Sequence, residues 1–246
     1  MEHPALACFA RRAEPRARLV CFPHAGGGAH AFATWGELLP EWVEVHAVAY
    51  AGRGPRLKEP FAEDWRSLIA ECAAAVRTVA DRPVALFGHS FGATVAVAVA
   101  ALLKQEGRAP LRVFASASPP PQAAAPLDLG DLPDAELVAE LARRGWLSAA
   151  AREAGGAALV THALPPLRAD LRLLDEARAA MGAAAPAAPL TAVGGADDAT
   201  CDTADLERWA PWTAALTVAV VEGGGHFYVE THAAEAGALV EHALAA

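Results

Sequence analysis

The sequence predicts an α/β fold in which helices flank a mostly parallel central sheet. The first observation behind this prediction is that short apolar runs alternate with longer segments of helical spacing, as in repeated strand–helix–strand units. The second is size and composition: 246 residues, 54% hydrophobic and 20% charged, are enough for one sizeable core. We therefore expect a single domain over residues 1–246.

The expected strands are short and apolar. Residues 84–87, a continuous apolar run after Pro83, are typical of a strand buried on both faces of a parallel sheet. In residues 64–80, apolar side chains recur at the spacing of a helix. We predict strands over residues 18–22, 43–50, 84–87, 111–117, 190–193 and 216–221, and helices over 64–80, 92–105 and 228–245.

Residues 119–188 interrupt this alternation. They are rich in proline, contain no expected strand, and include two amphipathic helical patterns at 134–144 and 169–181. The segment follows a strand whose carboxyl end faces the ligand side of such a sheet. We therefore predict a helical lid subdomain at about 119–188, with an ordinary surface excursion as the alternative.

The composition argues against several classes of partner. The net charge is −9, whereas binding to nucleic acids or anionic membranes needs a surplus of basic residues. No apolar run is long enough for a membrane-spanning helix, and the first residues lack the basic region of a signal peptide. We expect a cytoplasmic protein with free thiols, because the scattered cysteines fit neither a zinc site nor a disulfide framework: Cys8, Cys21, Cys72 and Cys201.

The motif Gly88-His89-Ser90-Phe91-Gly92 carries the strongest chemical signal. It follows a predicted strand and precedes a helix of small residues, which is the strand–turn–helix context of a nucleophile elbow in α/β hydrolases. The glycines leave room for a strained turn that exposes the Ser90 hydroxyl. A glycine-rich turn with a capping serine is the structural alternative.

A nucleophilic serine needs a base and an acid that orients the base. His226 is the candidate base, because it follows a predicted strand and a run of three glycines late in the chain. The acid is expected after the strand at 190–193, where Asp197 and Asp198 both qualify. Asp202 and Asp205 are more distant candidates, and spacing alone does not choose among them.

An oxyanion hole needs two backbone N–H groups near the nucleophile. We expect one from Phe91, which follows Ser90, and one from Ala25 in the glycine-rich loop at 23–28. A phosphate-binding loop is the alternative interpretation of this segment. The sequence supports this alternative only weakly, because no G-K-[ST] or G-x-x-G follows the glycines.

Together these segments resemble the type II thioesterases of polyketide and nonribosomal peptide biosynthesis. The resemblance rests on FPHAGGGAHAFATW (22–35), YAGRGPRLKEP (50–60), FGHSFGA (87–93), GGADDAT (194–200) and VEGGGHFYVE (221–230), and covers nearly the whole chain. It implies an α/β-hydrolase fold with a helical lid, and hydrolysis of acyl or aminoacyl thioesters on the phosphopantetheine arm of carrier proteins.

Carried onto this chain, the resemblance assigns Ser90 as nucleophile and His226 as base. The family's acid lies three residues after a glycine in a G-x-x-D loop, which favours Asp198 over Asp197. Two departures, Y-A-G-R-G for the usual Y-P-G-R-G and G-G-H-F-Y for G-G-H-F-F, weaken assignment to a subgroup.

The expected partners are acyl or peptidyl carrier proteins of a synthase. Because the chain starts at its own methionine with no carrier segment, we expect a free-standing editing enzyme, a monomer, without metal or cofactor. Arg53 and Arg56 follow a predicted strand on the ligand side, where they either help to seat a carrier or its arm, or serve as structural or solvated arginines. The rival functions are a general serine esterase or lipase, and a catalytically silent carrier-binding partner.

Overall fold

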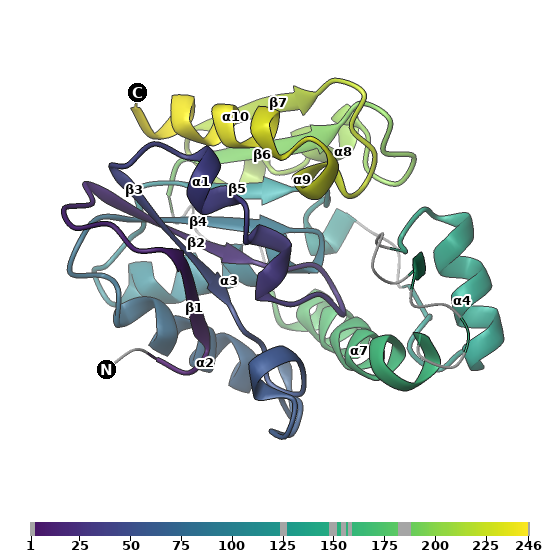
Figure 1. The fold of residues 1–246 in the computed structure, drawn as a ribbon. Coiled ribbons are helices and arrows are strands. Elements are labelled where there is room, and N and C mark those ends of the chain that lie inside the picture. The colour runs from purple at the N-terminus through teal and green to yellow at the C-terminus, as the bar shows by residue number, and fades with distance from the viewer. Residues whose placement is uncertain are drawn as a thin grey trace.

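The computed structural model describes residues 3–123, 127–147, 152–153, 156, 159–181 and 188–245. Its centre is a seven-stranded sheet of order β1-β3-β2-β4-β5-β6-β7 (Figure 1). The strands are β1 (Leu6–Ala10), β2 (Ala17–Phe22), β3 (Val43–Val48), β4 (Val84–His89), β5 (Val113–Ser116), β6 (Leu190–Gly195) and β7 (Leu216–Val221). Every neighbouring pair is parallel except β1 with β3, so the predicted mostly parallel sheet is confirmed.

All six predicted strands are present, and β1 is an additional strand that we did not predict. It lies at the sheet edge and pairs antiparallel with β3. Its residues are half-buried or exposed, and the short run LACFA shows neither a continuous apolar core nor a clean alternation. An edge strand of this kind leaves little periodic signal in the sequence.

Helices cover both faces of the sheet. α2 (Trp65–Arg77) and α3 (Phe91–Gln105) lie on one face, and α1 (Trp35–Leu38) and α10 (Ala233–Ala245) lie on the other (Figure 1). In β2, Val20 and Phe22 belong to the first of these two cores, while Leu19 and Cys21 belong to the second. This explains why the central strands are apolar at successive positions.

The predicted closing helix, 228–245, is divided in two. α9 (Tyr228–Thr231) is followed by His232, whose φ of −127° and ψ of 41° are not helical, and α10 begins at the next residue. The remaining short elements are the 3-10 turns η1 (Ala29–Phe32), η2 (Gly54–Arg56), η3 (Pro121–Ala123) and η5 (Ala210–Trp212), the π-helical turn η4 (Leu159–Ala163), and α8 (Thr203–Glu207).

The described residues of the 119–188 insertion contain helices but no strand, and they form a small core of their own. α4 (Asp134–Arg143) packs on α7 (Leu164–Ala180) through leucines such as Leu137, Leu141 and Leu171. Both helices lie on the side toward which the parallel strands point (Figure 1). Residues 124–126, 148–151, 154–155, 157–158 and 182–187 of the predicted lid lie outside the described residues.

α7 begins five residues earlier than predicted. Pro165 and Pro166 occupy its first turn, where the missing N–H groups have no helical partner and proline is tolerated. The predicted helix at 169–181 starts after these prolines. The earlier start brings Leu164 and Leu167 into the helix.

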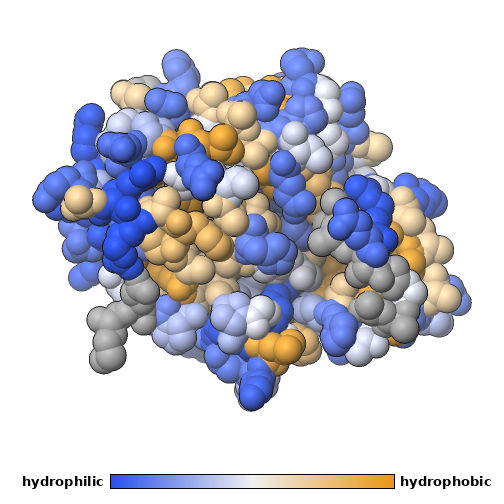
Figure 2. Space-filling model, viewed as in Figure 1, coloured by the Kyte–Doolittle hydropathy of each residue, from blue (hydrophilic) through white to orange (hydrophobic). Residues whose placement is uncertain are grey.

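The side of the surface seen in Figure 2 carries both hydrophilic and hydrophobic residues. On the side shown in Figure 2, hydrophobic residues form separate groups among hydrophilic ones. Within the described part of the chain, no helix combines the length and hydrophobicity needed to cross a membrane.

Candidate active site

Ser90 occupies a sharp turn between β4 and α3. Its φ of 55° and ψ of −118° lie in a region that L-residues rarely adopt, and its N–H donates to the Ser116 carbonyl at 2.7 Å. A Cβ at Gly88 would collide with the Gly92 carbonyl, and one at Gly92 would collide with the Phe22 carbonyl. The two glycines therefore permit the close packing of β4, α3 and β2 that this turn requires.

The three residues predicted as a triad are adjacent in space. The Ser90 hydroxyl donates to His226 Nε2 at 3.2 Å, and His226 Nδ1 donates to Asp198 Oδ2 at 2.8 Å. Both His226 and Asp198 are buried. They come from the loops after β7 and β6, so the carboxyl ends of β4, β6 and β7 together present a serine, an imidazole and a carboxylate in series.

The structure distinguishes among the four candidate acids. Asp198 faces His226, whereas Asp197 is exposed. Asp202 is the N-cap of α8 and forms a capping box with Asp205, so these two carboxylates stabilise a helix start. Sequence reasoning missed Thr200, whose N–H and hydroxyl donate to Asp198 Oδ1 at 2.9 and 2.6 Å.

Asp198 is held as a carboxylate. Burial raises its pKa, but the hydrogen bonds and charge of His226 and the two hydrogen bonds from Thr200 outweigh burial and lower the pKa below its usual value. An ionised carboxylate at Nδ1 keeps the other ring nitrogen, Nε2, free to accept a proton from Ser90. The arrangement is therefore suited to nucleophilic catalysis by a serine hydroxyl.

Two further histidines lie close to His226 without joining the triad. Burial lowers the pKa of His24 to about 3 and also lowers that of His89, so both rings are neutral near neutral pH. The His89 ring is hydrogen-bonded at Nδ1 to the Ser116 hydroxyl at 2.7 Å. The buried position of His89 within the elbow gives it a structural role.

The two expected oxyanion donors lie beside Ser90. Ala25 and Phe91 line the same small cavity of about 50 Å³ as Ser90 and His226. Phe91 is also the first residue of α3, so its N–H is at the positive end of a 15-residue helix. The position of these two residues supports the predicted oxyanion hole, and the roles of Ala25 and Phe91 as its donors stay a prediction.

Asp170, on α7, anchors the loop that carries Ala25. Asp170 Oδ2 accepts the N–H of Gly26 at 2.8 Å, and both carboxylate oxygens accept from Arg53 Nη1 and Nη2 at 2.5 and 2.7 Å. Arg53 Nη1 also donates to the Gly27 carbonyl at 3.3 Å. The carboxylate and the guanidinium are both buried, and each also bonds to the glycine-rich loop, so α7 and this loop are tied together.

The structure favours the structural alternative for Arg53 and Arg56, because both side chains are buried in ion pairs. Arg53 is buried against Asp170. Arg56 is also buried; it donates to Glu59 at 3.0 and 2.6 Å, to Glu71 at 2.5 Å and to a backbone carbonyl. Sequence reasoning located both arginines on the ligand side of the sheet but could not identify their carboxylate partners.

We expect Asp170→Asn to lower kcat by about 10-fold to 10²-fold with a smaller change in KM, since one oxyanion donor is worth about 10²-fold to 10³-fold. An amide oxygen at the place of Oδ2 can still accept from Gly26 and Arg53, but the NH₂ group then faces the Nη2 donor of Arg53 and the buried guanidinium loses its counter-charge, so the anchor of the loop is weakened. Steady-state kinetics and the affinity for a trifluoromethyl ketone, which forms a bound oxyanion, test this. Asp131→Asn, an exposed carboxylate paired with Arg172, is the control. Equal kcat in Asp170→Asn and wild type would contradict the anchoring role.

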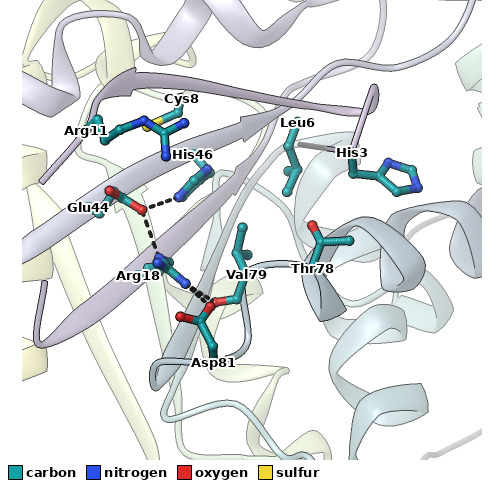
Figure 3. A pocket seen from close by; sticks show the side chains of 10 residues that line it. All are labelled: His3, Leu6, Cys8, Arg11, Arg18, Glu44, His46, Thr78, Val79 and Asp81. Carbon is teal, nitrogen blue, oxygen red and sulfur yellow. Dashed lines mark hydrogen bonds and ion pairs between the residues drawn. The ribbon is translucent and has the colours of Figure 1, made fainter. Parts of the chain in front are cut away.

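Among the described residues, one group has the composition of a metal site. Cys8, Glu44 and His46 bring potential ligand atoms within 4.8 Å of one another in a cavity at the β1 edge of the sheet (Figure 3). Glu44 already accepts from His46 and from Arg18, each at 2.8 Å, and from a backbone N–H. The guanidinium of Arg18 competes with a cation for the same carboxylate, so we interpret this cluster as an ion pair that joins β2 and β3.

Comparisons with known proteins agree with the fold. The sequence profile of the family described as "Thioesterase domain" matches residues 17–246. The chain is 33% identical to a "Probable cadicidin biosynthesis thioesterase" of Streptomyces griseus, over 87% of this chain and 59% of that protein. It is 40% identical to the medium-chain S-acyl fatty acid synthase thioesterase of Rattus norvegicus, over 52% and 49%. These alignments therefore span only about half to three fifths of those two relatives.

Among solved structures, the RedJ thioesterase of the prodiginine pathway in Streptomyces coelicolor is similar over almost the full length. It superimposes with a TM-score of 0.82 at 32% identity, covering 95% of this chain and 90% of that one.

Proposed function

Because the chain belongs to the thioesterase family and has its α/β-hydrolase fold, we propose that it is a free-standing type II thioesterase. In this proposal it hydrolyses acyl or aminoacyl thioesters on the phosphopantetheine arm of carrier proteins in polyketide or nonribosomal peptide synthesis. The observation that carries the proposal is the hydrogen-bonded series from Ser90 through His226 to Asp198 beside two cavities. Full-length similarity to a thioesterase of a biosynthetic pathway supports the substrate class.

The first half of the proposed reaction transfers the acyl group to the enzyme. Ser90 Oγ attacks the thioester carbonyl carbon while His226 Nε2 takes the hydroxyl proton. The carbonyl oxygen becomes an oxyanion that the N–H groups of Ala25 and Phe91 stabilise. When the carbon–sulfur bond breaks, the proton on His226 passes to the leaving thiolate, and the acyl group remains as an ester on Ser90.

The second half returns the enzyme to its starting state. His226 Nε2 accepts a proton from a water molecule, and the hydroxide attacks the ester carbonyl through the same oxyanion hole. Collapse of the intermediate returns the proton to Ser90 and releases a carboxylic acid. Asp198 stays ionised throughout and stabilises the imidazolium in both halves.

The proposal includes acyl or peptidyl carrier proteins as partners and a cytoplasmic location. It also includes a monomeric enzyme that works without a metal or cofactor. The Ser–His–Asp mechanism uses only the chain's own side chains and water.

We expect a carrier-bound acyl thioester to be hydrolysed with higher kcat/KM than an oxygen ester of the same acid or the same acyl group on a short pantetheine mimic. Contacts with the carrier, remote from the reacting carbonyl, can supply binding energy that orients the thioester. Steady-state kinetics with all three substrates tests this. Preference for the oxygen ester would favour a general esterase, and a failure to label Ser90 with a fluorophosphonate would favour a silent carrier-binding protein.

A further inference from the structure

Two cavities meet at Ser90 and His226, and they differ in chemical character. The smaller, of about 50 Å³, contains the two expected oxyanion donors and is walled largely by leucines of α4 and α7. The larger, of about 480 Å³, contains three arginines in its wall: Arg143, Arg144 and Arg178. A thioester substrate has an acyl end and a polar arm, so the two cavities can receive one end each.

The three arginines leave the larger cavity with an excess of positive charge. Arg143 and Arg144 share a single carboxylate, Glu140, and Arg178 pairs with Asp175 at 2.5 Å. In the part of the chain that the structure describes, the Arg178 Nε atom is buried and has no hydrogen-bond partner. The exposed side-chain fractions of Arg178, Arg144 and Arg143 are 12%, 25% and 69%, so the three lining arginines range from nearly buried to exposed.

Trp146 connects this arginine group to the reaction centre. The ring centre of Trp146 lies 5.8 Å from that of His226 and 5.0 Å from the guanidinium carbon of Arg144. Its indole N–H donates to the Thr200 hydroxyl at 3.0 Å, which orients the ring. One aromatic ring therefore separates the Arg144 guanidinium from the imidazole, and an anion held by Arg144 would lie a short way along the cavity from Ser90.

We propose that Arg144 and Arg178, with Arg143 at the rim, bind the phosphate group of the phosphopantetheine arm. This inference rests on the proposed function and adds a recognition site for a defined part of the substrate. Guanidinium groups present paired N–H donors to phosphate oxygens, a geometry that lysine does not offer. The net charge of the chain is −9, so a group of three arginines at this cavity is a local excess of positive charge in an acidic protein.

The length of the arm agrees with binding at the outer part of the cavity. Thirteen bonds separate the thioester sulfur from the phosphorus atom. An extended polypeptide advances about 3.5 Å for every three backbone bonds, so the extended arm spans about 15 Å. Arg178 lies about 6 Å along α7 from Leu174, which lines both cavities. Ser90, Arg144 and Arg178 line the same cavity, so an arm of this length can extend from Ser90 toward the two arginines.

The test compares acetyl-phosphopantetheine with acetyl-pantetheine, which differ only in the phosphate. We expect wild-type kcat/KM to be about 10-fold to 10²-fold higher for the phosphorylated substrate at low salt, and this ratio to fall toward one in Arg144→Ala/Arg178→Ala. Arg172→Ala is the matched control, because Arg172 is an exposed arginine of α7 that pairs with Asp131. The control should keep the wild-type ratio. Circular dichroism and fluorophosphonate labelling of Ser90 verify that each variant is folded.

Equal kcat/KM on the two substrates in the wild type would overturn the phosphate site. So would a preference that persists in the double variant. If the arginine substitutions lower kcat/KM only for an intact acyl-carrier protein, the arginines bind carboxylates of the carrier. That result would also overturn the phosphate site. In each case hydrolysis of the thioesters themselves would leave the proposed function standing, whereas loss of all thioester hydrolysis in the wild type would refute that function first.

Discussion

Ser90→Ala is expected to lower the kcat of thioester hydrolysis by about 10⁶-fold, the loss seen when a serine hydrolase loses its nucleophile. The hydroxyl that alanine lacks is the group that His226 contacts at 3.2 Å, and no acyl-serine can form without it. The fold should be unaffected. Alanine keeps the Cβ that serine already places at a φ of 55°, and the Ser90 N–H still reaches the Ser116 carbonyl.

Single-turnover kinetics with a carrier-bound acyl thioester and mass spectrometry of the trapped enzyme measure this effect. Ser67→Ala is a control, because the Ser67 hydroxyl belongs to the capping box of α2 and its loss should cost stability without reducing turnover. An acyl group trapped on a serine other than Ser90 in the wild-type protein would refute the assignment of the nucleophile.

The nucleophile could be predicted because its determinants are local. Five consecutive residues contain the turn, the hydroxyl and the two glycines whose missing Cβ atoms allow β2, β4 and α3 to pack closely. The base was identifiable in a similar way, because His226 follows a strand and three glycines. The sequence left Asp197 and Asp198 unresolved until the family pattern favoured Asp198. Adjacent residues in a turn point in different directions, and only the fold determines which faces the imidazole.

The features that sequence reasoning missed depend on distant pairing. Arg53 and Asp170 are 117 positions apart, and no spacing rule connects an arginine after β3 with an aspartate at the start of a predicted amphipathic helix. Arg144 likewise acquires its position only because α4 ends where Trp146 reaches His226. β1 was missed for a different reason: a half-buried edge strand needs no regular apolar pattern.

Asp198→Asn is expected to lower kcat by about 10⁴-fold, whereas Asp197→Asn should change it less than threefold. An asparagine at 198 must present its oxygen to one side and its NH₂ group to the other. If the NH₂ faces His226, it donates to Nδ1, so the ring proton moves to Nε2 and the ring cannot accept the proton of Ser90. If the oxygen faces His226, the NH₂ meets the two donors of Thr200. Neither orientation satisfies both neighbours.

The exposed side chain of Asp197 faces no such conflict, and its backbone N–H, which donates to the Gly224 carbonyl at 2.9 Å, is the same in asparagine. The pair is therefore an internally controlled experiment: both variants remove one negative charge from the same loop, and only one removes it from the partner of His226. Steady-state kcat for the two, with thermal melts to check that both fold, decides the acid. A large loss in Asp197→Asn with near-normal turnover in Asp198→Asn would show that the acting carboxylate is Asp197 and that the loop rearranges in solution.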